Sequence, residues 1–296
     1  MRLHHALAVL GLLWAAPGIA QPADTLAAED GWRSTLVAQL AGSQAAYANW
    51  QEGGIDALAL SARADGTFDR VFGRVLLRQE GAFLFALLRQ DTLDLRKADD
   101  LIRYAVQADL RNDGDFHPSA RFTARSQLAA GFDYSPDAAD YPSLAVVPGE
   151  ALKVSAFAAP AQLTQSLGVV WAPGGGFTAR TGLGLKETIV AIERLRPVFG
   201  NALDEAVRVQ AGLDGELRLE RELIENVLLK SRLTSFQAFN QVGDVAPDVL
   251  FENTLALKVN DLLTVTLDAA QVYDRDISAD VQRRQSLAVG VTVSLL

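Results

Sequence analysis

The sequence predicts an all-β protein, a single transmembrane antiparallel β-barrel of about 12 strands. Three observations lead to this prediction. Polar and apolar residues alternate with a period of two along most of the chain, many alternating segments run for ten or more residues, and the N-terminus has the pattern of a secretory signal. Apolar residues make up 49% of the chain, which excludes a disordered protein.

The first 20 residues have the pattern of a cleavable signal peptide. Arg2 precedes an apolar run over 6–16, and Gly18-Ile19-Ala20 provides the small residues that signal peptidase requires, so we expect cleavage after Ala20. The run is too short to serve as a membrane-spanning helix, which needs about 20 residues. The chain is therefore divided into a signal peptide (1–20), an N-terminal spacer (21–31) and an outer-membrane β-barrel domain (32–296).

The mature part of the chain repeats the strand period. Along 213–220, three leucines and a glycine occupy one face of an extended segment and four charged residues occupy the other. Membrane strands need about 9–11 residues, whereas soluble strands average about 5–6. We predict strands over 34–49, 54–66, 72–89, 99–111, 119–134, 162–172, 177–190, 204–219, 222–239, 247–260, 262–274 and 284–296.

A soluble β-sandwich is the alternative, because its strands alternate in the same way. The barrel is favoured because the apolar faces are poor in large aromatic residues and because the alternation continues to Leu295. Asn112-Asp113-Gly114 and Asp65-Gly66 predict turns, whereas Asp214-Gly215 lies within continuous alternation and is assigned to a strand. The segments 135–160 and 191–203 contain proline and are predicted to be loops, or segments folded against the barrel.

The alternation assigns charged residues to the lumen and aromatic residues to the membrane interfaces. Charges inside a barrel must pair or stay hydrated. The predicted lumen-facing charges are Arg121, Arg125, Lys186, Glu216, Arg218, Glu220, Lys230, Arg232, Lys258 and Asp268. The predicted interface aromatics, for which ordinary packing is the alternative, are Trp32, Tyr47, Trp50, Tyr134, Trp171 and Tyr273.

Composition and motifs exclude several other classes of function. The chain has no cysteine, and its net charge of −9 does not suit nucleic-acid binding. His117, the single histidine after the signal peptide, precedes a proline at a predicted turn and is interpreted as a solvated loop residue. Asp113, Asp115, Asp274 and Asp276 could offer oxygen ligands to calcium, but Asp-x-Asp spacing is common in acidic loops. We therefore expect no enzyme activity, no metal site and no cofactor.

Several short motifs resemble, in their order along the chain, a known family. They are Trp50 with Gly53-Gly54, Lys97-Ala98-Asp99-Asp100, Arg125-Ser126-Gln127 with Gly131-Phe132-Asp133-Tyr134, Ser155 to Pro160, Gly168 with Pro173, and Tyr273-Asp274. The chain thereby resembles the family catalogued as domain of unknown function 3078 over roughly 32–296. It departs from the family pattern at Ala156, Ala161 and Leu296. The resemblance implies a signal-bearing outer-membrane barrel and no particular activity.

The expected location is the outer membrane of a Gram-negative-type bacterium. The expected partners are outer-membrane lipid and the barrel-assembly machinery, with no nucleic acid and no identified solute. Mixed charges in a 12-stranded lumen suit two functions. The first is a small polar-solute channel or uptake component, the alternative is a structural or interaction barrel with a charge-filled, closed lumen, and an outer-membrane hydrolase ranks a distant third.

Overall fold

The computed structural model describes residues 31–46, 55–239, 246–278 and 280–294. The predicted signal peptide and nearly all of the predicted spacer lie outside this part of the chain, as do Tyr47 and Trp50. No helix among the described residues is long and apolar enough to cross a membrane, which leaves open a crossing by strands.

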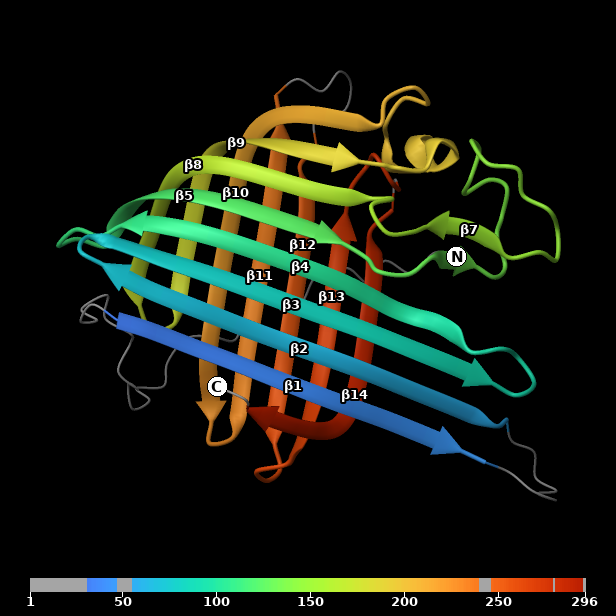
Figure 1. Ribbon diagram of the computed structural model, residues 1–296, viewed down its shortest axis with the longest axis horizontal. Helices are drawn as coiled ribbons and strands as arrows, with labels where there is room; N and C mark the ends of the chain where they lie inside the picture. The colour runs from blue at the N-terminus through green and yellow to red at the C-terminus, as the bar shows by residue number, and fades with distance from the viewer. Residues whose placement is uncertain (1–30, 47–54, 240–245, 279, 295–296) are drawn as a thin grey trace, which may run out of the picture.

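Long antiparallel strands make up most of the described chain (Figure 1). Twelve of them form the barrel: β1 (Gly31–Ala45), β2 (Ala57–Phe72), β3 (Val75–Gln90), β4 (Arg96–Leu110), β5 (Phe116–Ser126), β8 (Ala161–Gly174), β9 (Phe177–Ile189), β10 (Val207–Ile224), β11 (Val227–Ala238), β12 (Asp248–Lys258), β13 (Leu263–Tyr273) and β14 (Gln282–Ser294). The predicted fold class and strand number are confirmed.

The sheet closes on itself in the order β1-β14-β13-β12-β11-β10-β9-β8-β5-β4-β3-β2. Every neighbouring pair is antiparallel, so the backbone groups of each strand find partners on both sides, as closure requires. Among the described residues the closing pair is the shortest, joining Val37–Ala41 to Gly290–Ser294. In Figure 1, β1 to β5 form the near wall, β11 to β14 form the far wall, and β8 to β10 bend from one to the other.

The two ends of the barrel differ in the length of their connections. One end, called here the short-turn end, has the connections 73–74, 111–115, 175–176, 225–226 and 259–262. The opposite long-loop end has the connections 46–56, 91–95, 127–160, 190–206, 239–247 and 274–281. Two of these, 127–160 and 190–206, form a folded layer beyond the strand ends that we call the cap (Figure 1).

The cap is built from the two segments that the sequence predicted to be loops or folded segments. It contains the two-stranded sheet of β6 (Gly131–Asp133) and β7 (Leu152–Ser155), and the 3-10 helix η1 (Glu193–Phe199). Ala159, Val190 and Leu195 are fully buried, and together they form a small hydrophobic core. The cap is therefore a packed structure with its own apolar centre.

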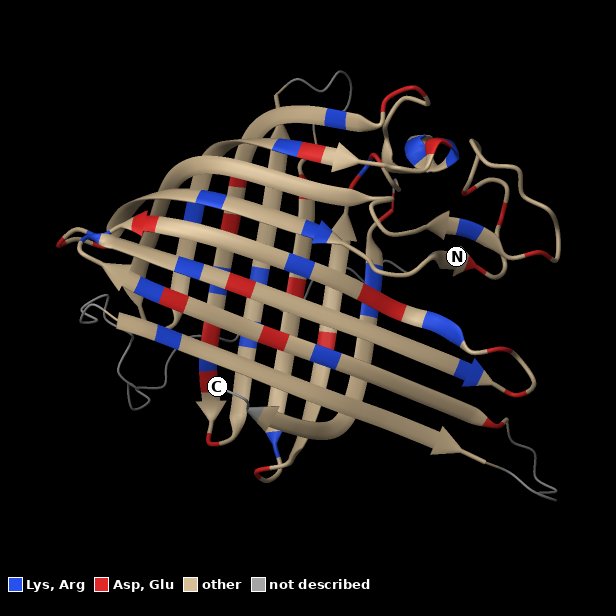
Figure 2. Ribbon diagram, viewed as in Figure 1, with Lys and Arg blue, Asp and Glu red and all other residues tan. Residues whose placement is uncertain are grey.

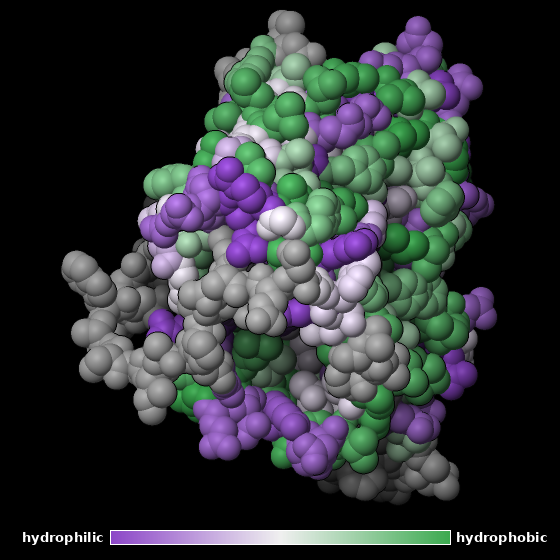
Figure 3. Space-filling view, turned by 60° about the vertical axis from the view of Figure 1, so that its left-hand side comes forward, coloured by the Kyte–Doolittle hydropathy of each residue, from purple (hydrophilic) through white to green (hydrophobic). Residues whose placement is uncertain are grey.

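The outer face of the barrel wall is apolar, and the inner face carries charged residues. Side chains on the outer face are apolar and exposed, as at Leu167 (72%), Leu183 (64%) and Leu287 (70%). Figure 3 shows such hydrophobic side chains over much of the visible wall. Figure 2 shows charged residues along the middle of the strands in both walls, where the ion pairs described below place their side chains inside the barrel.

The strand bounds correct two details of the sequence prediction. Asp65-Gly66 is not a turn, because β2 continues to Phe72 and the chain reverses at residues 73–74. Asp65 faces inward as an ion-pair partner of Arg63, so its charge belongs to the strand. The strand predicted over 119–134 ends at Ser126, where the chain enters the cap. The Asn112–Gly114 turn and the unbroken strand through Asp214 are confirmed.

Candidate functional site

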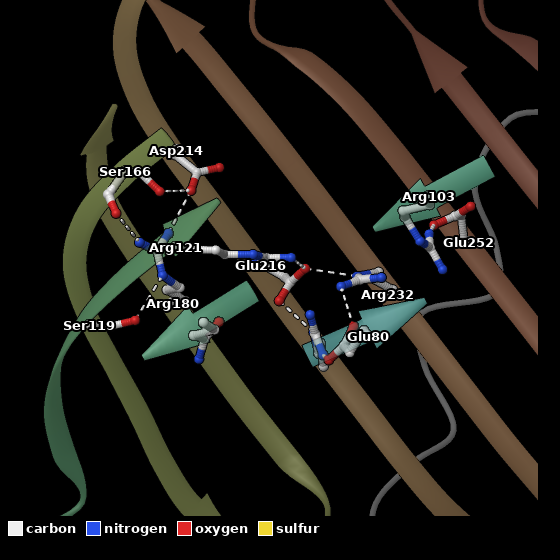
Figure 4. Close-up of polar contacts among 12 residues, drawn as sticks. Glu80, Arg103, Ser119, Arg121, Ser166, Arg180, Asp214, Glu216, Arg232 and Glu252 are labelled. Atoms are coloured by element: carbon white, nitrogen blue, oxygen red, sulfur yellow. Dashed lines mark hydrogen bonds and ion pairs between the residues drawn. The ribbon is translucent and has the colours of Figure 1, made fainter. Parts of the chain in front are cut away.

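The lumen contains a network of ion pairs centred on two glutamates. Glu216 of β10 accepts hydrogen bonds from Arg121 Nη2 at 2.6 Å, from Arg232 Nε at 2.7 Å and from Arg218 Nε at 2.5 Å. Its side chain is 4% exposed. Glu80 of β3 binds the same Arg218, and its second oxygen accepts from Arg232 Nη2 at 3.1 Å (Figure 4). One guanidinium, that of Arg232, therefore bridges both carboxylates.

Two ion pairs, Glu80–Arg232 and Arg103–Glu252, join opposite walls of the barrel. In the closed strand order, five strands separate β3 from β11 in either direction, and five separate β4 from β12. Glu80 and Arg232 lie on the first pair of strands. Arg103 and Glu252 lie on the second, with Arg103 Nη1 2.7 Å from Glu252 Oε2. Side chains from diametrically opposed strands thus meet directly in the lumen.

A second set of contacts fills the lumen where β5, β8, β9 and β10 adjoin. Arg180 is buried and donates to Asp214 at 2.5 Å, to Ser119 Oγ at 3.3 Å and to the carbonyl of Ser166 at 3.2 Å. Ser166 Oγ donates to the same carboxylate at 2.7 Å. The buried guanidinium of β9 is thereby held by groups from three other strands, β5, β8 and β10 (Figure 4).

The predicted lumen charges occupy two kinds of environment. Arg121, Lys186 and Glu216 are buried, and Arg218, Arg232 and Asp268 are partly buried in ion pairs, Asp268 with Arg63 at 2.9 Å. Lys230 and Lys258 lie near the short-turn end with half-exposed side chains. They pair with Glu220 and Asp261, so each of the two lysines has an acidic partner. Arg125 is half-buried on β5.

Sequence analysis missed several partners in these ion pairs. In the predicted strand 247–260, Glu252 has the same two-residue phase as the polar residues Thr254, Lys258 and Asn260. Extending this alternation by two residues toward the N-terminus would have found it. Glu80 had no such signal, because β3 carries apolar residues on both faces. The other missed partners include Arg63, Asp69, Arg78, Asp99, Arg103, Arg180, Asp214, Asp248 and Arg284.

His117 is not a solvated loop residue, so that interpretation was wrong. It is the second residue of β5, it is 2% exposed, and its Nδ1 has no hydrogen-bond partner. The strand begins at Phe116, earlier than predicted, so His117 lies within the strand and its side chain is buried. The catalytic use of a general base requires a partner and access to substrate, and the described surroundings of His117 supply no hydrogen bond to Nδ1.

Four of the predicted interface aromatics belong to the described residues, and they lie near strand ends or in the cap. Trp32 is the second residue of β1, and the Arg70 guanidinium lies over its ring, 4.7 Å from the centroid. Trp171, near the end of β8, stacks on Phe116 with ring centroids 6.2 Å apart. Tyr273 ends β13, and Tyr134 lies in the cap beneath the Arg96 guanidinium at 3.9 Å.

At the long-loop end, a polar cluster lies on the rim beside the cap. Lys186 binds Asp248, and Arg208 Nη2 donates to Asp276 Oδ2 at 2.6 Å. Burial and the nearby carboxylates of Asp248 and Asp276 raise the pKa of Asp274 to about 6, against the opposing effect of Lys186. In the cap itself, Tyr141 donates a hydrogen bond to Asp133, and burial together with this bond raises the pKa of Tyr141 to about 12.

Comparison with known proteins gives one family match and several distant structural likenesses. The model of the family described as "Protein of unknown function (DUF3078)" matches residues 43–132, which confirms the resemblance over that part of the chain. No curated protein matches the chain.

Three solved structures illustrate the likeness in fold. The translocator domain of the autotransporter NalP from Neisseria meningitidis is 11% identical, with a TM-score of 0.33 over 90% of this chain and 89% of that one. The Salmonella typhi OmpF complex with daunomycin is 9% identical, with a TM-score of 0.32 over 90% and 98%. OmpT, an outer membrane protein of Vibrio cholerae, is 9% identical, with a TM-score of 0.30 over 92% and 100%. These likenesses are too distant to bear on function, and the barrel is established by its own strand pairing.

Proposed function

We propose that this chain spans the outer membrane as a structural or interaction barrel with a closed, ion-paired lumen, and that the cap carries its working surface. Membrane placement is supported by the apolar outer wall, since soluble proteins rarely expose contiguous apolar areas of this extent. The expected partners are outer-membrane lipid and the barrel-assembly machinery. We propose no enzymatic role.

The difference between the two ends of the barrel supports an orientation. Bacterial outer-membrane barrels have short turns on the periplasmic side and long loops on the external side. The short-turn end therefore faces the periplasm in our proposal, and the cap faces the exterior. This orientation gives the cap access to molecules outside the cell.

The direct contacts between opposite walls favour this function over a small polar-solute channel. Glu80 and Arg232 approach to 3.1 Å from opposite walls, and Arg103 and Glu252 approach to 2.7 Å. No hydrated solute fits between atoms in direct hydrogen-bond contact. Separating such buried pairs without replacing them is strongly unfavourable, about 3–5 kcal/mol for loss of one partner.

Planar-bilayer recording of the purified protein tests the proposal. We expect no conductance steps from the folded wild-type chain at moderate potentials. Glu80→Ala combined with Arg232→Ala removes one contact between opposite walls, and we expect conductance to appear in this variant. The matched control replaces Glu220 and Lys230 with glutamine, because this pair is exposed and joins neighbouring strands, not opposite walls.

A conducting wild-type barrel would overturn the closed-lumen proposal. Steps whose anion preference falls in Lys230→Glu/Arg232→Glu would instead support the small polar-solute channel. Both outcomes require that the protein is folded. Gel electrophoresis can verify this, because an unheated, folded barrel migrates differently from a heated, unfolded sample.

A further inference from the structure

Three carboxylates from two segments meet at the long-loop rim. Asp248 begins β12, and Asp274 and Asp276 follow the end of β13. Pairing of Val249 with Tyr273 brings the two segments together. One oxygen from each carboxylate lies within 4.8 Å of the others. Two oxygens bound to one Ca²⁺ at about 2.4 Å can be at most about 4.8 Å apart, so the cluster has a suitable size.

Two of the three carboxylates are held by basic residues of β9 and β10. Lys186 pairs with Asp248, and Arg208 pairs with Asp276. Asp274 is only 6% exposed, and it accepts a hydrogen bond from the backbone N–H of Asp276 at 3.0 Å. A buried carboxylate is unfavourable unless a cation or a proton compensates its charge.

Gln210 supplies an independent indication of a ligand. It is 4% exposed, and its side-chain oxygen Oε1 has no hydrogen-bond partner. Gln210 lies directly opposite Lys186 in the sheet and two residues after Arg208, so all three side chains share the inner face. The Gln210 side chain therefore lies on the inner face beside Lys186 and Arg208, each of which reaches a carboxylate of the cluster.

We propose that Asp248, Asp274, Asp276 and the Gln210 side-chain oxygen bind one calcium-type divalent cation. All the candidate ligands are oxygen atoms, which hard cations prefer, and no sulfur or imidazole donor belongs to the group. This inference replaces the sequence-based expectation of no metal site. Of these four ligands, only Asp274 and Asp276 were among the candidate calcium ligands in the sequence. Closure of the sheet adds Asp248 and Gln210.

The site would fasten the cap to the barrel rim. Arg208 donates to the carbonyl of Phe199 in η1 at 3.3 Å as well as to Asp276. A Cβ at Gly200 would lie 2.8 Å from the Cβ of Asp276, so the cap segment already touches this residue. A cation on Asp276 therefore stabilises the contact between the 190–206 segment and the strands.

Calorimetric titration of CaCl₂ into the full, chelator-treated chain in detergent is the direct test. We expect one site, a loss of affinity of at least about tenfold in Asp274→Asn, and a smaller loss in Gln210→Leu. Gln210→Glu adds a charged ligand and should bind calcium more tightly than wild type, a gain that misfolding cannot imitate. Asp261→Asn, which removes an exposed acid at the short-turn end, should bind as wild type does.

Limited trypsin digestion gives a second readout. Calcium should slow cleavage within 190–206 severalfold in the wild type and leave the rate unchanged in Asp274→Asn. Absence of calcium binding by the folded wild type at millimolar concentration would overturn the proposal, as would equal affinity in Asp274→Asn. Neither experiment depends on conductance, so failure here is distinguishable from failure of the closed-lumen proposal.

Discussion

At the scale of single residues, glycines determine where the barrel wall can bend. Gly168 and Gly182 face each other on β8 and β9, and Gly184 and Gly212 face each other on β9 and β10. A Cβ at Gly168 would lie 2.0 Å from the carbonyl oxygen of Thr181. These positions coincide with the strands that turn from the near wall to the far wall in Figure 1. The close approach of the two backbones leaves no room for a side chain.

Gly168→Ala should therefore destabilise the barrel by about 1–3 kcal/mol, the usual cost of forcing extra volume into a packed site. Gly81→Ala is the matched control, because a Cβ at Gly81 meets no atom within 4 Å. Urea unfolding in detergent micelles, followed by tryptophan fluorescence, measures both changes. Equal stability of the two variants would show that Gly168 is not required for the bend.

Residue facing could be predicted from the sequence, but residue partners could not. Alternation placed Glu216 and Arg232 on the inner face, because each strand's period is a local property. The ion pairs that Arg218 and Arg232 form with Glu80, 138 and 152 positions earlier in the chain, depend on how the sheet closes. Closure depends on register and strand tilt around the whole barrel, and no local pattern encodes it.

At the scale of elements, strand number was predictable, whereas strand ends and the cap were not. Alternation persists through β10 across Asp214-Gly215, and it correctly outweighed the turn signal there. The same signal at Asp65-Gly66 was misleading, because β2 carries both residues within its pairing with β1 and β3. The cap has no regular period, since its small core is assembled from separate segments.

Lipid-facing positions on these elements can be tested with a buried charge. Leu217 of β10 is 43% exposed on the outer face, with the ion-paired Glu216 and Arg218 beside it on the inner face. Leu217→Arg should cost about 2–4 kcal/mol if the residue lies near the bilayer midplane. Leu262→Arg, in a short turn, should be nearly neutral. Unfolding titrations in phospholipid vesicles measure the difference, and equal stabilities would contradict the membrane-facing assignment of β10.

At the scale of the whole molecule, closure of the sheet produces a continuous wall. It also brings side chains from opposite strands into direct contact in the lumen. The wall closes through a short β1–β14 pairing, while ion pairs connect strands that are far apart around the ring. The interior contacts therefore add connections that the backbone ladder does not supply. The two ends remain chemically different, with short turns at one and a packed cap at the other. The molecule is thus a closed barrel with one elaborated end, which is the shape that our functional proposal requires.

The orientation of this elaborated end can be tested in intact cells, because the chain contains no cysteine. Ala138→Cys places one thiol on an exposed residue of the cap, and Asp113→Cys places one in an exposed short turn. A membrane-impermeant maleimide should label Ala138→Cys on whole cells and label Asp113→Cys only after the outer membrane is permeabilised. The cysteine-free wild type controls for background labelling. The reverse pattern would place the cap in the periplasm, and labelling of both variants without permeabilisation would contradict a barrel that spans the membrane with its short turns inside.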